Sequence, residues 1–196
     1  MQNSSMNSYP LLRRQISQGG FTLIELLMTM VVLVVLLAIG APQLQIFLVK
    51  RTAVVQAESL AHALRVARSE AIKRGQKVTI CNSANPEGAT KTCATTSTDW
   101  SSGWLVFVDT GTNAKAFDSG ETLLAVQAAF TNSGGLTLSS SKPAITFAPN
   151  GLAIGDNASF RSKPNLSGTA ADAAKLNRCV KLAISGRVKI EEGTCS

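Results

Sequence analysis

Residues 21–49 read FTLIELLMTMVVLVVLLAIGAPQLQIFLV, an almost unbroken run of apolar side chains that contains one carboxylate, Glu25. A helix rises about 1.5 Å per residue and needs about 20 apolar residues to cross roughly 30 Å of hydrocarbon, so this run is long enough to span a membrane. A secretory signal peptide has only about 7–15 apolar residues before a small-x-small cleavage site, and here the apolar pattern continues past residues 38–41. We therefore expect a membrane-spanning helix.

Residues 1–20 are polar, carry Arg13 and Arg14 as their only charges and end in a Gly-Gly pair. Basic residues before a span stay in the cytoplasm, so the pattern predicts a cytoplasmic leader, a single-pass helix and an exported remainder. Met6 is an alternative start that would shorten the leader. A plain membrane anchor would not explain Glu25, because a lone carboxylate inside a spanning helix is costly and usually has a partner.

Beyond Lys50, small and apolar residues recur at three- and four-residue spacing, which is typical of an amphipathic helix. They are Val54, Ala57, Leu60, Ala61, Leu64, Ala67, Ala71 and Ile72. Gly75 favours a helix end. The pattern predicts one helix from about Phe21 to Arg74, about 80 Å long, whose part at residues 50–74 lies on a globular head. His62 is the chain's one histidine, and we expect it to be a solvated or packed helix residue rather than a ligand.

After residue 75 the apolar pattern changes to a period of two. It predicts strands at residues 77–81, 103–109, 122–130, 144–148 and 179–184. Segments 82–101, 110–121 and 155–177 are rich in Ser, Thr, Asn, Gly, Pro and Ala and are predicted to be loops. The expected fold is α+β, with one long N-terminal helix packed on an antiparallel β-sheet head at residues 75–196. The net charge of +7 permits contact with nucleic acid or anionic membrane without requiring it.

The heptapeptide GFTLIEL at residues 20–26 resembles the processing and methylation motif of type IV pilins and type II secretion pseudopilins. The resemblance implies that a prepilin peptidase cuts after Gly20 and methylates Phe21. It also implies that Glu25 pairs with the free N-terminus of a neighbouring subunit during assembly, which would let two buried opposite charges compensate each other. Pro42 lies where these helices commonly carry a proline, a residue that kinks or locally melts a helix.

Further segments follow in a characteristic order. They are RSEA at residues 68–71, the strand at 77–81, GWLVFVD at 103–109, ITF at 145–147 with Gly151, and SGR at 185–187. In this order they are similar to the GspH/FimT branch of the superfamily, which includes the pseudopilin GspH and the minor pilins FimT and FimU. The resemblance implies a minor pilin or pseudopilin whose partners are other minor subunits, the major pilin and the prepilin peptidase. It also implies that the helix is anchored in the inner membrane, with the head in the periplasm, before the subunit enters the filament. It does not separate a type IV pilus from a type II secretion pseudopilus.

The chain has four cysteines, Cys81, Cys93, Cys179 and Cys195. They form no C-x-x-C motif, so we do not expect a zinc site. Disulfides persist in the periplasm, where the head is predicted to lie. Of the three pairings that four cysteines allow, we favour Cys81–Cys93 and Cys179–Cys195.

The C-terminal apolar residues alternate and predict a hairpin. Placing their apolar faces on one side puts Ile184 opposite Val188 and leaves a three-residue loop at 185–187. In this register Lys181 faces Glu191, a favourable cross-strand pair.

The same loop suggests an alternative function. Some FimT proteins bind DNA with a C-terminal Gly-Arg-x-Arg element, and residues 186–189 resemble it with Lys189 in place of the second arginine. The candidate phosphate contacts are Arg178, Lys181, Arg187, at the predicted exposed tip, and Lys189. Such contacts to double-stranded DNA would be non-specific and salt-sensitive. Glu191 and Glu192 reduce the local positive potential, and lysine lacks the bidentate geometry of arginine.

The sequence does not predict an enzyme, a cofactor or a metal site. No nucleophile–base set can be placed around His62, and no phosphate-binding glycine-rich loop is present. Asp109, Asn113, Asp118 and Glu121 lack the D-x-[DN]-x-[DN]-G pattern of a calcium loop, so we expect a β-turn there.

Overall fold

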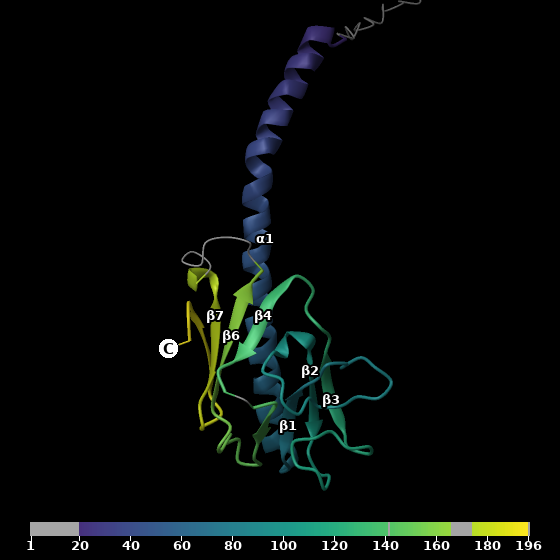
Figure 1. The fold of residues 1–196 in the computed structure, drawn as a ribbon, viewed down its shortest axis with the longest axis vertical. Helices are drawn as coiled ribbons and strands as arrows, with labels where there is room; N and C mark the ends of the chain where they lie inside the picture. The colour runs from purple at the N-terminus through teal and green to yellow at the C-terminus, as the bar shows by residue number, and fades with distance from the viewer. Residues whose placement is uncertain (1–19, 141, 166–173, 196) are drawn as a thin grey trace, which may run out of the picture. The chain divides into compact units, whose positions relative to one another are not determined.

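We describe a computed structural model of the chain at residues 20–140, 142–165 and 174–195. The helix α1 spans Leu23–Arg74, within two residues of the predicted start and at the predicted end. The chain forms two compact units that divide after Pro42, and each is described by itself. In Figure 1, α1 is coloured from purple to blue and the strands of the second unit follow in teal, green and yellow.

The first unit contains the apolar part of α1. Thr22 precedes the helix, and its Oγ1 accepts a hydrogen bond of 3.3 Å from the backbone N–H of Glu25. This is the geometry of an N-cap, which satisfies one of the free N–H groups at a helix start. Residues 23–40 have a mean hydropathy of 2.8, and none of them is buried within the chain.

The second unit contains two four-stranded antiparallel sheets rather than the one sheet predicted. The first has the order β3-β2-β1-β5 and the second β4-β6-β7-β8. The strands of the first sheet are β1 (Val78–Asn82), β2 (Trp104–Val108), β3 (Leu123–Gln127) and β5 (Ala144–Phe147). Those of the second are β4 (Ser133–Leu138), β6 (Ala158–Pro164), β7 (Arg178–Leu182) and β8 (Val188–Glu192).

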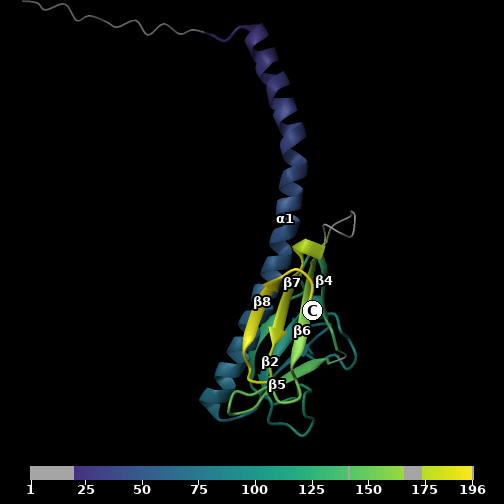
Figure 2. The same ribbon diagram turned by 90° about the vertical axis from the view of Figure 1, so that its left-hand side faces the viewer.

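The core lies between α1 and the two sheets. The predicted stripe of α1 supplies small contact residues, and Ala57, Ala61, Ala67 and Ala71 are fully buried in one cluster with residues of both sheets. The short helix η1 (Trp100–Ser102) contributes Trp100, whose ring meets Phe160 of β6 edge-on at 5.1 Å between centroids. Figure 2 shows β7 and β8 beside the lower part of α1.

The prediction of a loop over 155–177 was wrong for β6, and β4 was not predicted. In β6, alternate residues face inward, but one of these inward residues is polar. The Ser162 hydroxyl lies 2.9 Å from the carbonyl oxygen of Ala53 and 2.8 Å from Oε1 of Gln56, both on α1. Because the helix satisfies this hydroxyl, a serine is tolerated at a core position and obscures the period-two pattern.

The predicted register of the C-terminal hairpin was also wrong. Leu182, rather than Ile184, lies opposite Val188. The connection is a five-residue loop at 183–187 instead of three residues at 185–187. A slip of two residues keeps every side chain on its own face, so the apolar pattern alone does not distinguish the two registers.

Tertiary contact selects the longer loop. The N–H of Ala183 donates to the carbonyl of Arg187 at 3.0 Å, and that of Gly186 donates to the carbonyl of Ala183 at 2.8 Å. Gly186 has a φ of +74°, and a Cβ there would lie 2.2 Å from the carbonyl oxygen of Gly151. Only glycine fits both this backbone conformation and this close approach.

Candidate functional site

The N-terminal segment presents the predicted processing residues openly. Gly20 is exposed, and the Phe21 side chain is 84% exposed. Glu25 is exposed on the first turn of α1 and is the one ionisable residue between Leu23 and Gly40. Its carboxylate makes no hydrogen bond or ion pair with any residue that the structure describes.

Pro42 lies inside α1, which continues through it to Arg74. A proline has no N–H to donate and removes one hydrogen bond from the helix ladder. The boundary between the two compact units falls directly after this residue. His62 is exposed on the later part of α1.

The structure has the two disulfides that the sequence favoured. Cys81–Cys93 has a Cα–Cα distance of 5.5 Å and ties β1 to the loop that follows it. Cys179–Cys195 has a Cα–Cα distance of 5.3 Å and ties β7 to the C-terminal segment. Both distances are ordinary for a disulfide, and each bond closes a loop of the head.

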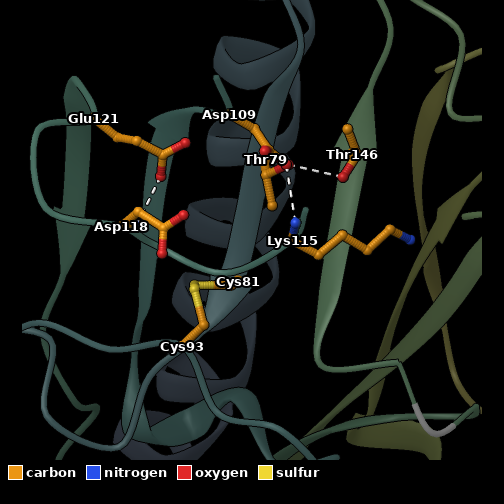
Figure 3. The surroundings of a disulfide bond; sticks show 8 residues. All are labelled: Thr79, Cys81, Cys93, Asp109, Lys115, Asp118, Glu121 and Thr146. Atoms are coloured by element: carbon orange, nitrogen blue, oxygen red, sulfur yellow. Dashed lines mark hydrogen bonds between the residues drawn. A yellow bond between two sulfur atoms is a disulfide. The ribbon is translucent and has the colours of Figure 1, made fainter. Parts of the chain in front are cut away.

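The acidic side chains of the loop at 110–121 accept hydrogen bonds from within that loop. Figure 3 shows one of them, in which the N–H of Asp118 donates to Glu121 Oε2 at 2.9 Å. Glu121 Oε1 accepts hydrogen bonds from the N–H groups of Thr110 and Gly111 at 2.8 and 2.7 Å. Asp118 accepts two more from Asn113. These hydrogen bonds account for the inward orientation of the two carboxylates, which needs no bound cation. Within the described ranges, no group of three or more ligating side chains gathers to hold a metal.

Asp109 directly follows β2, and its buried carboxylate also accepts hydrogen bonds from neighbouring groups of the chain. Its Oδ2 accepts from the Thr79 hydroxyl at 2.6 Å and from the Lys115 N–H at 3.0 Å. The Thr79 hydroxyl also lies 2.7 Å from that of Thr146, as Figure 3 shows. This network joins β1, β5 and the acidic loop, so these residues hold the first sheet together.

The C-terminal hairpin places three of its four candidate phosphate contacts against carboxylates. Arg178 pairs with Glu192 at 2.9 Å. Lys181 and Lys189 lie opposite each other and both bind Glu191, at 2.8 and 2.9 Å. The predicted Lys181–Glu191 pair therefore exists, but diagonally. The hydrogen bonds from Lys181 and then Lys189 lower the pKa of Glu191 to about 2. These pairs reduce the positive potential that DNA would meet.

Arg187, the fourth candidate, is exposed on the hairpin loop. The loop lies against Arg68 of α1, whose Nε donates to the carbonyl of Gly151 at 3.1 Å. Sequence reasoning used residues 68–71 only as a motif and did not bring Arg68 together with the hairpin. No local pattern shows this contact, because it depends on the approach of Gly186 to Gly151.

A long helix with an apolar first part, a second part packed on antiparallel sheets and an exposed cleavage motif defines a type IV pilin-like subunit. Two family profiles match the chain. They are the prokaryotic N-terminal methylation motif at residues 16–41 and the type II transport protein GspH at residues 56–186. The second covers more than half of the chain, and the chain belongs to the GspH family. It is a structural, non-enzymatic minor pilin or pseudopilin, which confirms the fold and the function predicted from the sequence.

Two crystal structures of the type IV minor pilin FimU from Pseudomonas aeruginosa are similar to the chain. The form in space group P21 has a TM-score of 0.51 and 20% sequence identity, and the match covers 71% of this chain and 87% of FimU. For the form in P65 the values are 0.48, 21%, 69% and 89%. At this identity the likeness of the first form shows the fold alone. No curated protein matches the chain.

The methylation motif implies processing by a prepilin peptidase, and the family implies assembly into a pseudopilus. The apolar helix and the family together indicate anchoring in the inner membrane and incorporation into a pilus-type filament.

Proposed function

We propose that the chain is an inner-membrane prepilin that is cut after Gly20, methylated at Phe21 and drawn into a pilus or pseudopilus by residues 21–49. Residues 75–196 form the periplasmic head, and residues 50–74 hold it on the helix. The observation that carries this proposal is the exposure of residues 23–40, which have a mean hydropathy of 2.8 and no burial within the chain. Apolar surface of this kind gains free energy when covered, so lipid before assembly and other subunits after assembly are its packing partners.

Glu25 is the assembly residue in this proposal. Cleavage after Gly20 creates a positive amine at Phe21, and methylation keeps it basic. A carboxylate in an apolar environment is costly when it is alone and is compensated by an opposite charge. Glu25 has no partner among the described residues of its own chain. The amine of a neighbouring minor pilin, pseudopilin or major pilin supplies one.

Substitution of Glu25 tests this role. Both Glu25→Ala and Glu25→Gln should be cleaved normally, because the cut lies five residues away, but should be lost from sheared filaments. Glu25→Gln keeps the size and polarity of the side chain and removes only its charge. Cleavage is measured by the mass of the membrane-bound chain, and incorporation by immunoblotting of the sheared fraction.

The matched control is Thr29→Ala, because the Thr29 hydroxyl only donates to the Leu26 carbonyl on the same helix. This variant should assemble normally. Normal incorporation of Glu25→Gln would show that charge pairing is not the role of this residue.

The second proposal is a receptor for double-stranded DNA, supported by the exposed side chains of Arg187 and Lys189 on one hairpin. The full chain in detergent would be titrated with duplex DNA at 50 and 200 mM salt, because phosphate contacts weaken steeply over about this range. A receptor should lose affinity at the higher salt and lose binding in an Arg187→Ala/Lys189→Ala variant. No binding, or equal binding by the variant, would leave the structural role alone.

A further inference from the structure

A hollow opens between the last turns of α1 and the β7–β8 loop. It measures about 390 Å³ and is lined from the helix by Arg65, Arg68, Ser69 and Ile72, and from the hairpin by Gly186, Arg187 and Val188. We call this site the arginine hollow, because three of these seven residues are arginines.

The hollow is held in place by contacts that do not involve a ligand. Arg68 is half-buried, and its Nε donates to the carbonyl of Gly151. Gly186 lies directly against this pair, since a Cβ there would come within 2.9 Å of Arg68 Nε. The loop therefore stays against the helix and keeps Arg187 beside the hollow, which is the preorganisation that makes a recognition site effective.

The charge of the hollow is not balanced within the described part of the chain. The ion pairs found there involve none of Arg65, Arg68 and Arg187. Glu70, the acidic residue on the nearest turn of α1, is held by Lys73 at 3.2 Å and Arg74 at 2.6 Å. Guanidinium groups bind carboxylates and phosphates in a bidentate manner. The hollow thus presents three cations that fit an acidic partner.

Exposed apolar side chains lie in the hollow and on the turns next to it. Ile72 lines the hollow and is 52% exposed. Ile154 and Ile184 do not line it, but they are 68% and 53% exposed on the two turns that carry Gly151 and Gly186, and the N–H of Ala153 joins these turns by donating to the carbonyl of Ile184 at 2.9 Å. Apolar side chains next to arginines are typical of the centre of a protein–protein interface. The phosphate backbone of DNA offers nothing that would bury three isoleucines, so this surface fits a protein better than a nucleic acid.

We infer that the arginine hollow docks an acidic segment of another subunit of the same filament. Carboxylates of that segment bind Arg65 and Arg187, and neighbouring apolar side chains cover the three isoleucines. The inference rests on the proposed function, since it takes the partner to be a pilin or pseudopilin. Charge complementarity identifies the partner's chemistry: the hollow is basic, and its occupant is acidic with apolar flanks.

Photo-crosslinking in cells that build the filament tests this inference. The full-length chain would carry p-benzoylphenylalanine in place of Ile154, beside the hollow. The test variant is Arg65→Glu/Arg187→Glu, which reverses two exposed charges and leaves Arg68 and its structural bond intact. The control is Arg51→Glu/Lys175→Glu, which makes the same charge change at two exposed positions, one on α1 and one before β7, that do not line the hollow.

The wild-type chain should crosslink to one defined segment of another subunit, and that segment should contain Asp or Glu. The yield should fall about tenfold or more in the arginine variant, as expected when buried charge pairs become like-charge contacts, and stay unchanged in the control. Changing the acidic residues of the captured segment to lysine should restore the yield in the arginine variant.

Three results would overturn the inference. The first is an equal loss of crosslink yield in the arginine variant and in the control, which indicates unspecific attraction. The second is persistence of the crosslink in the arginine variant. The third is disappearance of the crosslink after nuclease treatment, which indicates DNA. Incorporation of Glu25→Ala is measured in the same cells. If incorporation needs Glu25 but the crosslink ignores Arg65 and Arg187, the hollow inference fails and the proposed function stands. If Glu25→Ala is incorporated normally and the crosslink still depends on Arg65 and Arg187, the proposed function fails and the hollow inference stands.

Discussion

The two parts of α1 use the same backbone conformation for opposite purposes. Residues 23–40 carry large apolar side chains on every face and bury none of them within the chain. From Ala53 to Ala71 the apolar residues form one stripe, and most of that stripe is fully buried. Helical conformation alone therefore does not indicate what a helix packs against. The size and pattern of the side chains indicate it: the first part packs against groups outside the chain, and the second part packs against the sheets of its own chain.

The second part owes its packing to small residues. Alanines at 57, 61, 67 and 71 let the helix axis approach both sheets, whose own large side chains fill the remaining space. The first part has leucine, valine and methionine instead, which present surface to lipid or to other helices. A substitution in the second part of α1 or in the sheets should therefore change the free energy of unfolding of the head, whereas one in the first part of α1 should not.

The largest contrast is expected between core and exposed apolar residues. Phe160→Ala removes a fully buried ring that meets Trp100 edge-on, and should lower the free energy of unfolding of the head by about 3–5 kcal/mol. Leu33→Ala removes a side chain that is 56% exposed and should leave that free energy unchanged. Tryptophan fluorescence of the full chain in detergent, during denaturation by urea, measures both. The chain's two tryptophans, Trp100 and Trp104, are buried in the head.

If Leu33→Ala destabilised the head as much as Phe160→Ala, the first part of α1 would be part of the folding unit, and the comparison would fail.

A smaller contrast tests the two parts of the helix with one and the same substitution. Ala67→Leu adds three carbons where α1 meets the sheets and should cost about 1–3 kcal/mol through overpacking. Ala38→Leu makes the same change at an exposed position of the apolar part and should not destabilise the head. Leucine and alanine have similar helix propensities, so the difference reports packing. The same denaturation measures it, and equal values would contradict the alanine stripe as the contact surface.

The second part of the helix and the C-terminal strands were predictable because their apolar residues repeat with a clear period. The strands of the first sheet were predictable as short apolar runs between loop segments, and in β2, which reads WLVFV, every residue is buried. β4 and β6 were not predictable. β4 contains Gly134 and Gly135, which weaken a strand signal, and β6 carries Ser162 at an inward position that only the helix satisfies. The register of the hairpin needed the contact between Gly186 and Gly151, which no local pattern contains.

The candidate sites divide in the same way. Gly20, Phe21 and Glu25 lie in one contiguous motif, so the resemblance to a family located them at once. The arginine hollow brings Arg65 and Arg68 together with Arg187 from the opposite end of the chain. Distant residues of this kind become a site only through the fold, and sequence reasoning found Arg187 without its neighbours.

The smallest predicted effect concerns Glu191, whose carboxylate can be compared with that of Glu25 in the first part of α1. Its carboxylate has cationic partners within the head, Lys181 and Lys189, whereas Glu25 has none within the described chain. The pKa of Glu191 is lowered from about 4.5 to about 2 in the fold. A lowered folded-state pKa stabilises above the unfolded value, and this contribution is lost as the pH falls through about 4.5 towards 2.

Glu191→Gln removes this titration, so the melting temperature of the variant should start slightly lower at pH 6 and should fall less steeply between pH 5 and pH 2 than that of the parent chain. Near-ultraviolet circular dichroism of the full chain in detergent would follow both curves. Glu87→Gln is the matched control, because Glu87 is exposed and makes no ion pair among the described residues. Parallel curves for Glu191→Gln and the parent chain would mean that the two lysines do not hold this carboxylate in solution. The hairpin's positive charge would then be available to an external partner after all.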